Sequence, residues 1–554
     1  MLDSSRETRA KTGRAKGAAA RWTGVAALLS LLVAVGIADP GKTAGAARSG
    51  EFLRQAQIRS SRVLEVLARL GLLGVEPDPS VFERGGNSEA RRGLLRYAVR
   101  PATVSRLPST EFARRGLPGE FSFDLVSVAV DPKDWSDPRV GLDANPLERG
   151  RRWERGACVS LFEQGRLVRE TMAGIRIHGD RSRTREEKSL RLILTPAYGA
   201  SARAEDLLPG ARGESLVLHD DARQLCFVNP IAYEIAAALG CDVPRTRPVR
   251  VMLNGRMLET IYFLTEHLSR GLVAAMLGHR DFLFVNEKPW PRDEPKPEAY
   301  ASRCPSRDRT APCTMAGASR GVDVGGVIDW LAAVLFCAPH DCRQGVAYLD
   351  LEGDRRWRWI AWDMDWSFQP WPMDLVEGDP KPASFTEDLR RPIGDLRSAL
   401  FGALMADDPE FRARMLERVR VMLSHELRPE RLEAILERYR DIASRFGGGE
   451  RVFDSLDRIE VFVRERPERL LAELQRVFDL GPLYACSVRV PQGCGVLIDG
   501  FPYDRDWSGR FFAGQRLCLE ARGGVRGFRA GGRDLGPSAR LDVDRDLAIE
   551  AVPE

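Results

Sequence analysis

The chain has 554 residues, a length typical of about two to four domains. With 44% hydrophobic and 29% charged residues, the composition is that of a globular protein and excludes a disordered one. The formal net charge of +4 comes from 83 basic and 79 acidic residues. That balance, without a basic patch interleaved with aromatic residues, predicts no nucleic-acid partner.

Residues 1–50 are expected to form a basic tail, a signal or anchor segment and a linker. Residues 1–21 carry six basic and two acidic side chains, and the seventeen residues from Trp22 to Ala38 are uncharged. Basic residues before such a run predict that the tail stays in the cytoplasm and the body is exported. Gly36-Ile37-Ala38 is a candidate cleavage site, so two outcomes stay open. One is a single membrane span with an extracytoplasmic body, and the other is a cleaved signal on a secreted or periplasmic protein.

The ten cysteines fit an oxidising compartment. Two pairs are close in sequence and are plausible local disulfides, Cys304 with Cys313 and Cys486 with Cys494. The chain has no Cys-x-x-Cys motif and its six histidines are far apart in sequence, so we expect no zinc site.

Two segments are expected between residue 51 and the main domain. Residues 51–120 begin with a helix over Phe52–Leu73, whose apolar residues recur at helical spacing, and continue as an irregular region. Residues 121–172 are expected to form a small β-unit, because Phe121–Val130 and Ala157–Phe162 alternate as half-buried strands do.

Two further strands are predicted at Gly174–His178 and Lys188–Leu194, joined by a basic loop over residues 179–187. Backbone amides and guanidinium groups in such a turn suit phosphate oxygens, and a solvated hairpin tip is the alternative. Further along, Asn254-Gly255 predicts the tip of a hairpin within Val249–Leu264.

Helices are predicted on both sides of that hairpin and toward the C-terminus. Asn229 and Pro230 have the residue types of a helix cap and a first helical position, and Asp323–Cys337 is an apolar helix. Apolar stripes predict helices after Trp371, the last of them broken at Pro467. Residues 482–554 return to short strands with Gly-rich turns, which indicates a small sandwich-like module.

Three acids flank a second predicted hairpin, formed by Val346–Leu351 and Trp357–Trp362 around a Glu-Gly-Asp turn. Asp341 precedes it, and Asp363 and Asp365 follow it. If the backbone stays extended through this end, the last two carboxylates point to the same side. Protein kinases use the same order of a substrate-orienting Asp, an amide, two strands and a metal-binding Asp. A surface hairpin with solvated acids is the alternative.

Taken in order, these motifs resemble the CotH family of spore-coat-type protein kinases. The resemblance implies an α+β fold, with an atypical protein-kinase-like, two-lobed domain over residues 173–481 that ends in a helical part. The small N-terminal β-unit and a C-terminal all-β module over residues 482–554 flank it. The motifs that carry the resemblance are Ile175–Arg183, Lys188-Ser-Leu-Arg191, Asn229 with its helix, Leu253–Glu266, Asp341, and Trp362–Asp365 with Phe368.

The resemblance also implies roles for single residues. Asp341 and Lys188 would be catalytic, with Asp341 orienting the substrate hydroxyl. Asp363, Asp365 and Gln344 would hold Mg²⁺ or Mn²⁺, whereas the nucleotide would be bound by Arg183, Lys188, Arg191 and Glu266, with Glu266 ordering Lys188 or being structural. The chain has His178-Gly179 where the family usually carries an Arg-Gly pair.

Two functions follow from these expectations. The first is an exported or anchored kinase that transfers the ATP γ-phosphoryl group to Ser or Thr hydroxyls of a protein substrate. The second is a non-catalytic surface or envelope protein that keeps the kinase scaffold and binds a surface partner, since ATP is scarce outside the cytoplasm.

Overall fold

The computed structural model describes residues 120–220, 225–286, 297–301, 303, 311–340, 346–369, 384–386 and 396–554. The chain divides into two compact units, Met1–Ser105 and Arg106–Glu554, and all the described residues belong to the second. The expected signal or anchor segment, the helix over residues 52–73 and the irregular region after it lie outside the described residues, as do Asp341 and Gln344. Within the part of the chain that is described, no helix is both long and apolar enough to cross a bilayer.

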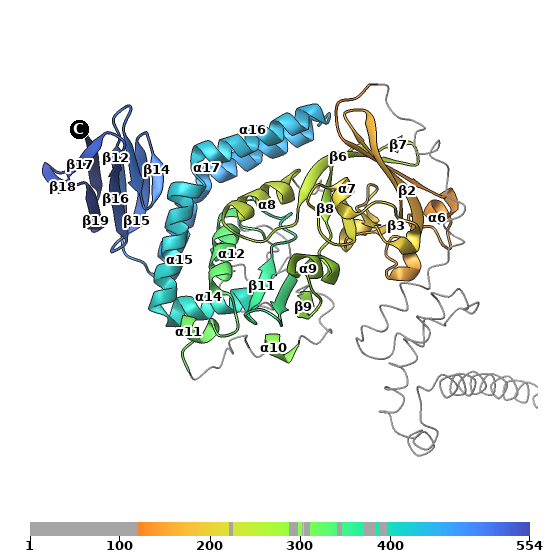
Figure 1. The fold of residues 1–554 in the computed structure, drawn as a ribbon, viewed down its shortest axis with the longest axis horizontal. Coiled ribbons are helices and arrows are strands. Elements are labelled where there is room, and N and C mark those ends of the chain that lie inside the picture. The colour runs from red at the N-terminus through yellow and green to blue at the C-terminus, as the bar shows by residue number, and fades with distance from the viewer. Residues whose placement is uncertain are drawn as a thin grey trace, which may run out of the picture. The chain divides into compact units, whose positions relative to one another are not determined.

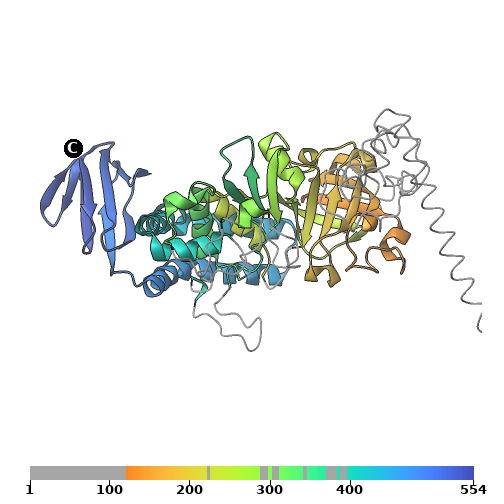
Figure 2. The same cartoon turned by 90° about the horizontal axis from the view of Figure 1, so that it is seen from below.

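A sheet of eight strands closes on itself to form a barrel (Figure 1, Figure 2). The closing pair is β1 with β6, which run parallel and place Leu125 beside Arg250. In the order of the sheet, the strands are β1 (Leu125–Val130), β2 (Arg155–Glu163), β3 (Arg166–Ile177), β4 (Leu190–Ile193), β5 (Ser215–Asp220), β8 (Tyr262–Glu266), β6 (Thr246–Leu253) and β7 (Arg256–Met257).

Alternate residues of these strands fill one apolar interior. Val126 and Val128 of β1 share it with Ile175 of β3 and Leu192 of β4, all of which are almost fully buried. Because side chains alternate between the two faces of a strand, the residues between them point to the outside of the barrel. The boundary expected at residue 172 falls inside β3, so the predicted small β-unit continues into the strands that follow it.

The predicted hairpin tip at Asn254-Gly255 is confirmed. It joins β6 to β7, and both residues adopt left-handed backbone angles, with φ of 50° and 82°. Asn and Gly tolerate that region better than other residues, which explains their preference for two-residue hairpin turns. The Asn254 side chain also accepts the backbone N–H of Val130 at 2.8 Å and so ties the hairpin to β1.

The rest of this part of the chain forms helices and a small sheet; α8 lies between β5 and β6 in sequence, and the other long helices come after β8. The helices are α8 (Val228–Ala238), α12 (Val324–Cys337), α14 (Leu396–Asp407), α15 (Pro409–Val421), the π-helix η6 (Met422–Glu426), α16 (Pro429–Arg445) and α17 (Glu450–Phe478). The sheet is β9 (Phe282–Asn286), β10 (Val346–Asp350) and β11 (Trp357–Ile360), with β10 in the centre. Shorter helices are α6 (Pro132–Ser136), η3 (Arg151–Trp153), η4 (Arg181–Thr184), η5 (Pro196–Tyr198), α7 (Ala204–Leu207), α9 (Arg270–Leu277), α10 (Glu298–Ala301) and α11 (Met315–Ala318).

Two details of these helices differ from the sequence predictions. Helix α8 begins at Val228 after a left-handed Phe227, so Asn229 is inside the helix and its side chain is available for another contact. Helix α17 runs unbroken through Pro467, because its buried stripe, which includes Val463 and Leu470, continues on both sides of the proline. The helix over Asp323–Cys337 is confirmed, with Asp323 accepting the N–H of Gly326 at its start.

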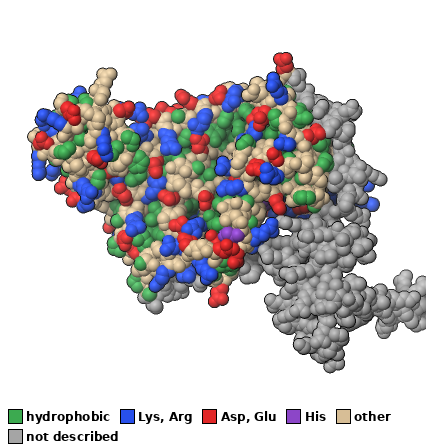
Figure 3. Space-filling model, viewed as in Figure 1, with side chains coloured by type: hydrophobic (Ala, Val, Ile, Leu, Met, Phe, Trp, Pro, Cys, Tyr) green, Lys and Arg blue, Asp and Glu red, His purple; other side chains and the backbone are tan. Residues whose placement is uncertain are grey.

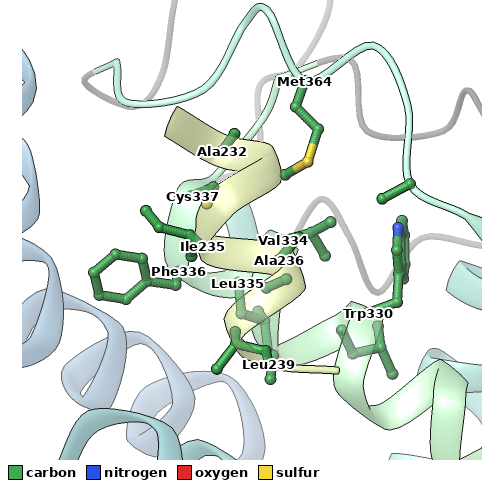
Figure 4. Packing of buried hydrophobic residues seen from close by; sticks show 14 of the residues in the cluster. Ala232, Ile235, Ala236, Leu239, Trp330, Val334, Leu335, Phe336, Cys337 and Met364 are labelled. Atoms are coloured by element: carbon green, nitrogen blue, oxygen red, sulfur yellow. The ribbon is translucent and has the colours of Figure 1, made fainter. Parts of the chain in front are cut away.

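Helices α8 and α12 form the centre of the larger hydrophobic core. Figure 4 shows Ile235 and Ala236 of α8 packed near Val334 and Leu335 of α12. Met364, from the segment after β11, reaches into the same cluster and is 2% exposed. The burial of this side chain anchors the segment that carries Asp363 and Asp365 onto both helices.

Residues 483–553 form nine strands in two sheets with their own core. The five-stranded sheet holds β15 (Trp507–Phe512), β12 (Leu483–Arg489), β20 (Leu547–Pro553), β17 (Val525–Ala530) and β18 (Arg533–Gly536), and the four-stranded sheet holds β14 (Phe501–Tyr503), β13 (Gly495–Ile498), β16 (Arg516–Arg522) and β19 (Ser538–Asp542). Cys486 lies in β12 and Cys494 precedes β13 of the other sheet. Both are buried free thiols, so the expected pairing is wrong. Cys304 lies outside the described residues.

A buried polar cluster joins these strands to the helices. Asp499, in the β13–β14 turn, accepts from Arg420 of α15 at 2.6 Å and from the backbone N–H of Cys518 at 2.9 Å, and lies 3.2 Å from Nε2 of His425 in η6. Burial raises the pKa of Asp499, but the His425 hydrogen bond and the Arg420 charge outweigh it and hold the pKa below its usual value of 3.8. On the surface shown in Figure 3, acidic and basic side chains are interspersed, in keeping with the balanced composition.

Candidate active site

The segment after β11 carries two of the predicted metal ligands, and α8 holds its backbone. Met364 donates its N–H to the Asn229 side-chain oxygen at 2.8 Å, and Asp363 donates its N–H to Tyr233 Oη at 3.3 Å. Asn229 is 4% exposed, so this contact is shielded from water. Two side chains one helical turn apart on α8 therefore fix the backbone at the predicted ligand Asp363.

The backbone is not extended here, contrary to expectation. Strand β11 ends at Ile360, and Asp363 has a left-handed φ of 57°. The alternation of side chains along a strand therefore does not apply to Asp363 and Asp365. Asp363 is half-buried, whereas Asp365 is 2% exposed, so the two carboxylates have different access to solvent.

The end of α12 is tied to the same segment. Phe368 donates its N–H to the carbonyl of Cys337 at 2.9 Å, and His340 donates its N–H to the carbonyl of Trp366 at 3.3 Å. His340 is the last described residue before the predicted catalytic Asp341. Asp341 and Gln344 themselves lie outside the described residues, so their predicted roles remain predictions.

The outer face of the barrel presents two arginines next to each other. Arg176 of β3 and Arg191 of β4 are paired in register, and both lie between residues that fill the interior. Arg176 contacts Glu154 at 3.3 Å, and Arg191 donates to Ser215 Oγ at 3.1 Å. Burial, followed by the charge of Arg176, lowers the pKa of Arg191 to about 10.

Three histidines connect this face to Trp362, the residue before Asp363. His178 follows β3, His219 is in β5, and His267 follows β8. The ring of His178 lies 6.5 Å from that of His219 and 5.5 Å from that of His267, and both His178 and His219 lie 6.4 Å from Trp362. His178, His219 and His267, which are far apart in sequence, therefore lie close together in space.

Tyr233 completes the contact from the other side. Its ring stacks on Trp362, with centroids 6.2 Å apart and an angle of 16° between the planes. A cavity of about 10 Å³, close to the space of one water molecule, lies between Trp362, Tyr233 and the barrel residues His219 and Thr265. Among the described residues, no group of three or more His, Cys, Asp or Glu side chains is arranged to hold a metal ion.

The remaining predicted nucleotide ligands have other partners. Lys188 lies 2.6 Å from Asp143 and is largely buried. All three guanidinium nitrogens of Arg183 donate hydrogen bonds, at 2.5 to 2.6 Å, to the backbone carbonyls of Pro146, Ile177 and Glu148. The Arg183 guanidinium therefore serves as a bridge within the fold, and an outward contact with a phosphate would have to break these bonds.

Glu266 does not order Lys188. It is fully buried and accepts hydrogen bonds from the backbone N–H of Arg212, from the Arg212 guanidinium and from the backbone N–H of Arg245. The alternative of a structural Glu266 is the one that this geometry supports. Arg176 and Tyr233 were not predicted as site residues. The alternation of Arg176 with the inward-facing Ile175 and Ile177 already indicates that it lies on the opposite face.

Comparison with known proteins identifies a matching family, and solved structures that resemble this chain. The family described as CotH kinase protein matches residues 175–299 and 314–451. One of the solved structures is the crystal structure of the Helicobacter pylori proinflammatory kinase CtkA, which matches 49% of this chain and 93% of its own chain at 8% identity and a TM-score of 0.26. No curated protein matches the chain. Through residues 175–451, about half of its length, the chain belongs to the CotH kinase family.

Proposed function

We propose that this protein is a kinase that transfers the ATP γ-phosphoryl group to Ser or Thr hydroxyls of a protein substrate. The observation that carries the proposal is the position of Asp363: α8 holds its backbone through Asn229 and Tyr233, and Trp362 beside it meets the cationic face of the barrel. Family membership supports a kinase-like activity, and the barrel and the helices after it would be the two lobes around the nucleotide.

The donor set fits a divalent metal of the hard class. Carboxylate oxygens suit Mg²⁺ or Mn²⁺, and Mg²⁺ usually takes only one or two carboxylates beside phosphate oxygens. Asp363, half-buried, and Asp365, almost fully buried, would supply them, with Gln344 as a further ligand. When bound, the metal would neutralise charge on the phosphate oxygens. Asp341 would orient the acceptor hydroxyl, and the chain's contribution would be positioning and fixed charge rather than covalent chemistry.

The expected compartment is outside the cytoplasm, from the basic tail and uncharged run at residues 1–38. Retention by one membrane span and release after cleavage are both compatible with this proposal. The second candidate is a non-catalytic surface or envelope protein, and the observation that favours it is the C-terminal pair of sheets with its own core, a unit suited to a binding partner. A rise in melting temperature with Mg²⁺ and ATP would count against that candidate, because a ligand that binds only the folded state stabilises it.

The test is transfer of radiolabel from γ-labelled ATP, with Mg²⁺ or Mn²⁺, to the protein itself and to a basic Ser-rich protein. Asp363→Asn and Asp341→Asn should abolish transfer. Glu352→Gln is a matched control, since Glu352 is an exposed acid in the turn of the same hairpin. The proposal is wrong if the wild-type protein transfers no label, or if Asp363→Asn transfers as much as Glu352→Gln.

A further inference from the structure

A cavity of about 450 Å³ lies where the last helices meet the C-terminal strands, and it shares no lining residue with the candidate active site. One wall is formed by η6, α16 and α17, and the other by β12 and β15. Ligand pockets in proteins are typically about 300–1,000 Å³ and mostly apolar. The helix wall has this character, since it presents five apolar side chains that are each less than 6% exposed: Leu427, Leu432, Leu436, Val463 and Leu471.

The two walls of the cavity contact each other directly. Trp507 of β15 donates its Nε1–H to the carbonyl of Ser424 in η6 at 3.1 Å. Gly509, also in β15, lies so close to η6 that a Cβ at this position would meet the Ser424 hydroxyl at 2.9 Å. These contacts fix the strands against the helix. The cavity is therefore a preformed space, which lowers the cost of ordering the protein around a ligand.

The wall formed by α17 includes a proline. Proline has no N–H, so in the middle of a helix it leaves the carbonyl four residues earlier without its usual donor. In α17 the proline is Pro467 and that carbonyl belongs to Val463, and both residues line the cavity. The helix wall therefore offers a backbone acceptor to a ligand within a surface that is otherwise largely apolar.

The charged side chains that line the cavity leave one acid over. Both arginines are paired with lining glutamates, Arg464 with Glu460 at 2.8 Å and Arg510 with Glu468 at 3.8 Å. Glu433 of α16 is exposed, and it has no hydrogen bond or ion pair among the described residues. The charge that remains for a ligand is therefore negative, at the edge of an apolar space.

We propose that this cavity is a binding site for a small apolar molecule that carries an amine. The apolar body displaces water from the leucine-lined wall, and the burial of apolar surface supplies most of the affinity. The ammonium group has three N–H donors, and its acceptors are the Glu433 carboxylate and the Val463 carbonyl. A carboxylate on the same apolar body is repelled by Glu433 and finds no free cation among the described lining residues.

The experiment titrates the full-length protein by calorimetry with phenylbutylamine, phenylbutanol and phenylbutyrate, which share one apolar body and differ in charge. We expect the amine to bind with a Kd below about 1 mM and about fivefold more tightly than the alcohol, and the carboxylate not to bind measurably. Glu433→Gln should remove the preference for the amine over the alcohol. Glu437→Gln is the matched control, since Glu437 is an exposed acid of α16 that does not line the cavity, and it should keep the preference.

Two further variants locate the site. Ala485→Trp enlarges an exposed residue of the strand wall and should abolish binding of the amine and the alcohol, whereas Ser538→Trp, at an exposed position of β19 outside the cavity, should change neither. Pro467→Ala returns a helical donor to the Val463 carbonyl, so it should weaken amine binding several-fold while it stabilises the fold. If Ala485→Trp does not fold, Glu433→Gln decides, because it changes only an exposed side chain.

Three results would overturn the inference. They are a wild type that binds none of the three molecules, an alcohol or carboxylate that binds as tightly as the amine, and a folded Ala485→Trp that binds the amine as well as Ser538→Trp does. None of the titrations contains ATP, and no residue of the cavity is part of the candidate active site. The outcome therefore leaves the proposed kinase function to its own test.

Discussion

The contact between Asn229 and Met364 should contribute to both stability and binding, and Asn229→Ala tests this. The Asn229 oxygen and the Met364 nitrogen are 2.8 Å apart, and both residues are less than 5% exposed. Removing the acceptor leaves a buried N–H unsatisfied, which costs about 1–3 kcal/mol. We therefore expect the free energy of unfolding to fall by about 2 kcal/mol, measured by urea denaturation.

The same change should weaken the binding of ATP with Mg²⁺. Asp363 is held at a left-handed φ of 57°, a conformation that costs a non-glycine residue on the order of 1–2 kcal/mol. Without the Asn229–Met364 hydrogen bond, Asp363 of the unliganded protein can leave the left-handed conformation. The ligand must then restore that conformation, and each 1.4 kcal/mol that this restoration requires weakens binding tenfold. We expect about tenfold weaker binding, measured by titration calorimetry.

Tyr233→Phe is the matched comparison. It removes a longer bond of 3.3 Å to the backbone of the half-buried Asp363 and leaves the stacked ring on Trp362 in place. Because this bond is long and Asp363 is only half-buried, we expect the free energy of unfolding to fall by only about 0.5–1 kcal/mol. If Asn229→Ala destabilises the protein less than Tyr233→Phe does, or leaves the affinity for ATP unchanged, the Asn229–Met364 contact does not hold this segment in place.

Three further predictions concern the rest of the fold. Asp499→Asn should lower the free energy of unfolding by about 3 kcal/mol, because the buried Arg420 guanidinium loses the negative charge of the Asp499 carboxylate. The pKa of Asp499 in the folded protein lies below its ordinary value of 3.8, so the ionised carboxylate stabilises the fold above pH 3.8, and this stabilisation is lost as the pH falls from 3.8 through the folded-state pKa. Denaturation measured at a series of acidic pH values should show this loss in the wild type and not in the variant. Pro467→Ala should raise the free energy of unfolding, by up to about 3 kcal/mol, since it restores a helix donor in α17; a thermal scan showing lower stability would contradict this. Non-reducing peptide mapping should find Cys486 and Cys494 unlinked, and a disulfide-linked Cys486–Cys494 peptide would contradict the free thiols seen in the structure.

Local patterns predicted the parts of the fold that local chemistry determines. The Asn254-Gly255 turn, the apolar helix over Asp323–Cys337 and the β10–β11 hairpin all depend on residues close in sequence, and each is present. The closure of the barrel was not predictable in this way. It depends on the parallel pairing of β1 with β6, which places Leu125 beside Arg250, and no local pattern in either segment predicts which strand it pairs with.

The candidate site shows the same division. Asn229 has the residue type of a cap, but its side chain serves Met364, 135 positions away. The sequence could have predicted that Lys188 and Arg191 lie on different faces of the barrel wall. Lys188 has the two-residue spacing of the interior residues Leu190 and Leu192, whereas Arg191 alternates with them. The gathering of His178, His219 and His267 could not, since it depends on which strands become neighbours across the barrel.

The most direct test of the account is a crystal structure of the protein with Mn²⁺ and a non-hydrolysable ATP analogue, with the metal located by its anomalous scattering. We expect Mn²⁺ within bonding distance of an Asp363 oxygen and of phosphate oxygens of the ATP analogue. A metal bound away from Asp363, or crystals that take up neither the metal nor the analogue, would show that the proposed kinase site is wrong.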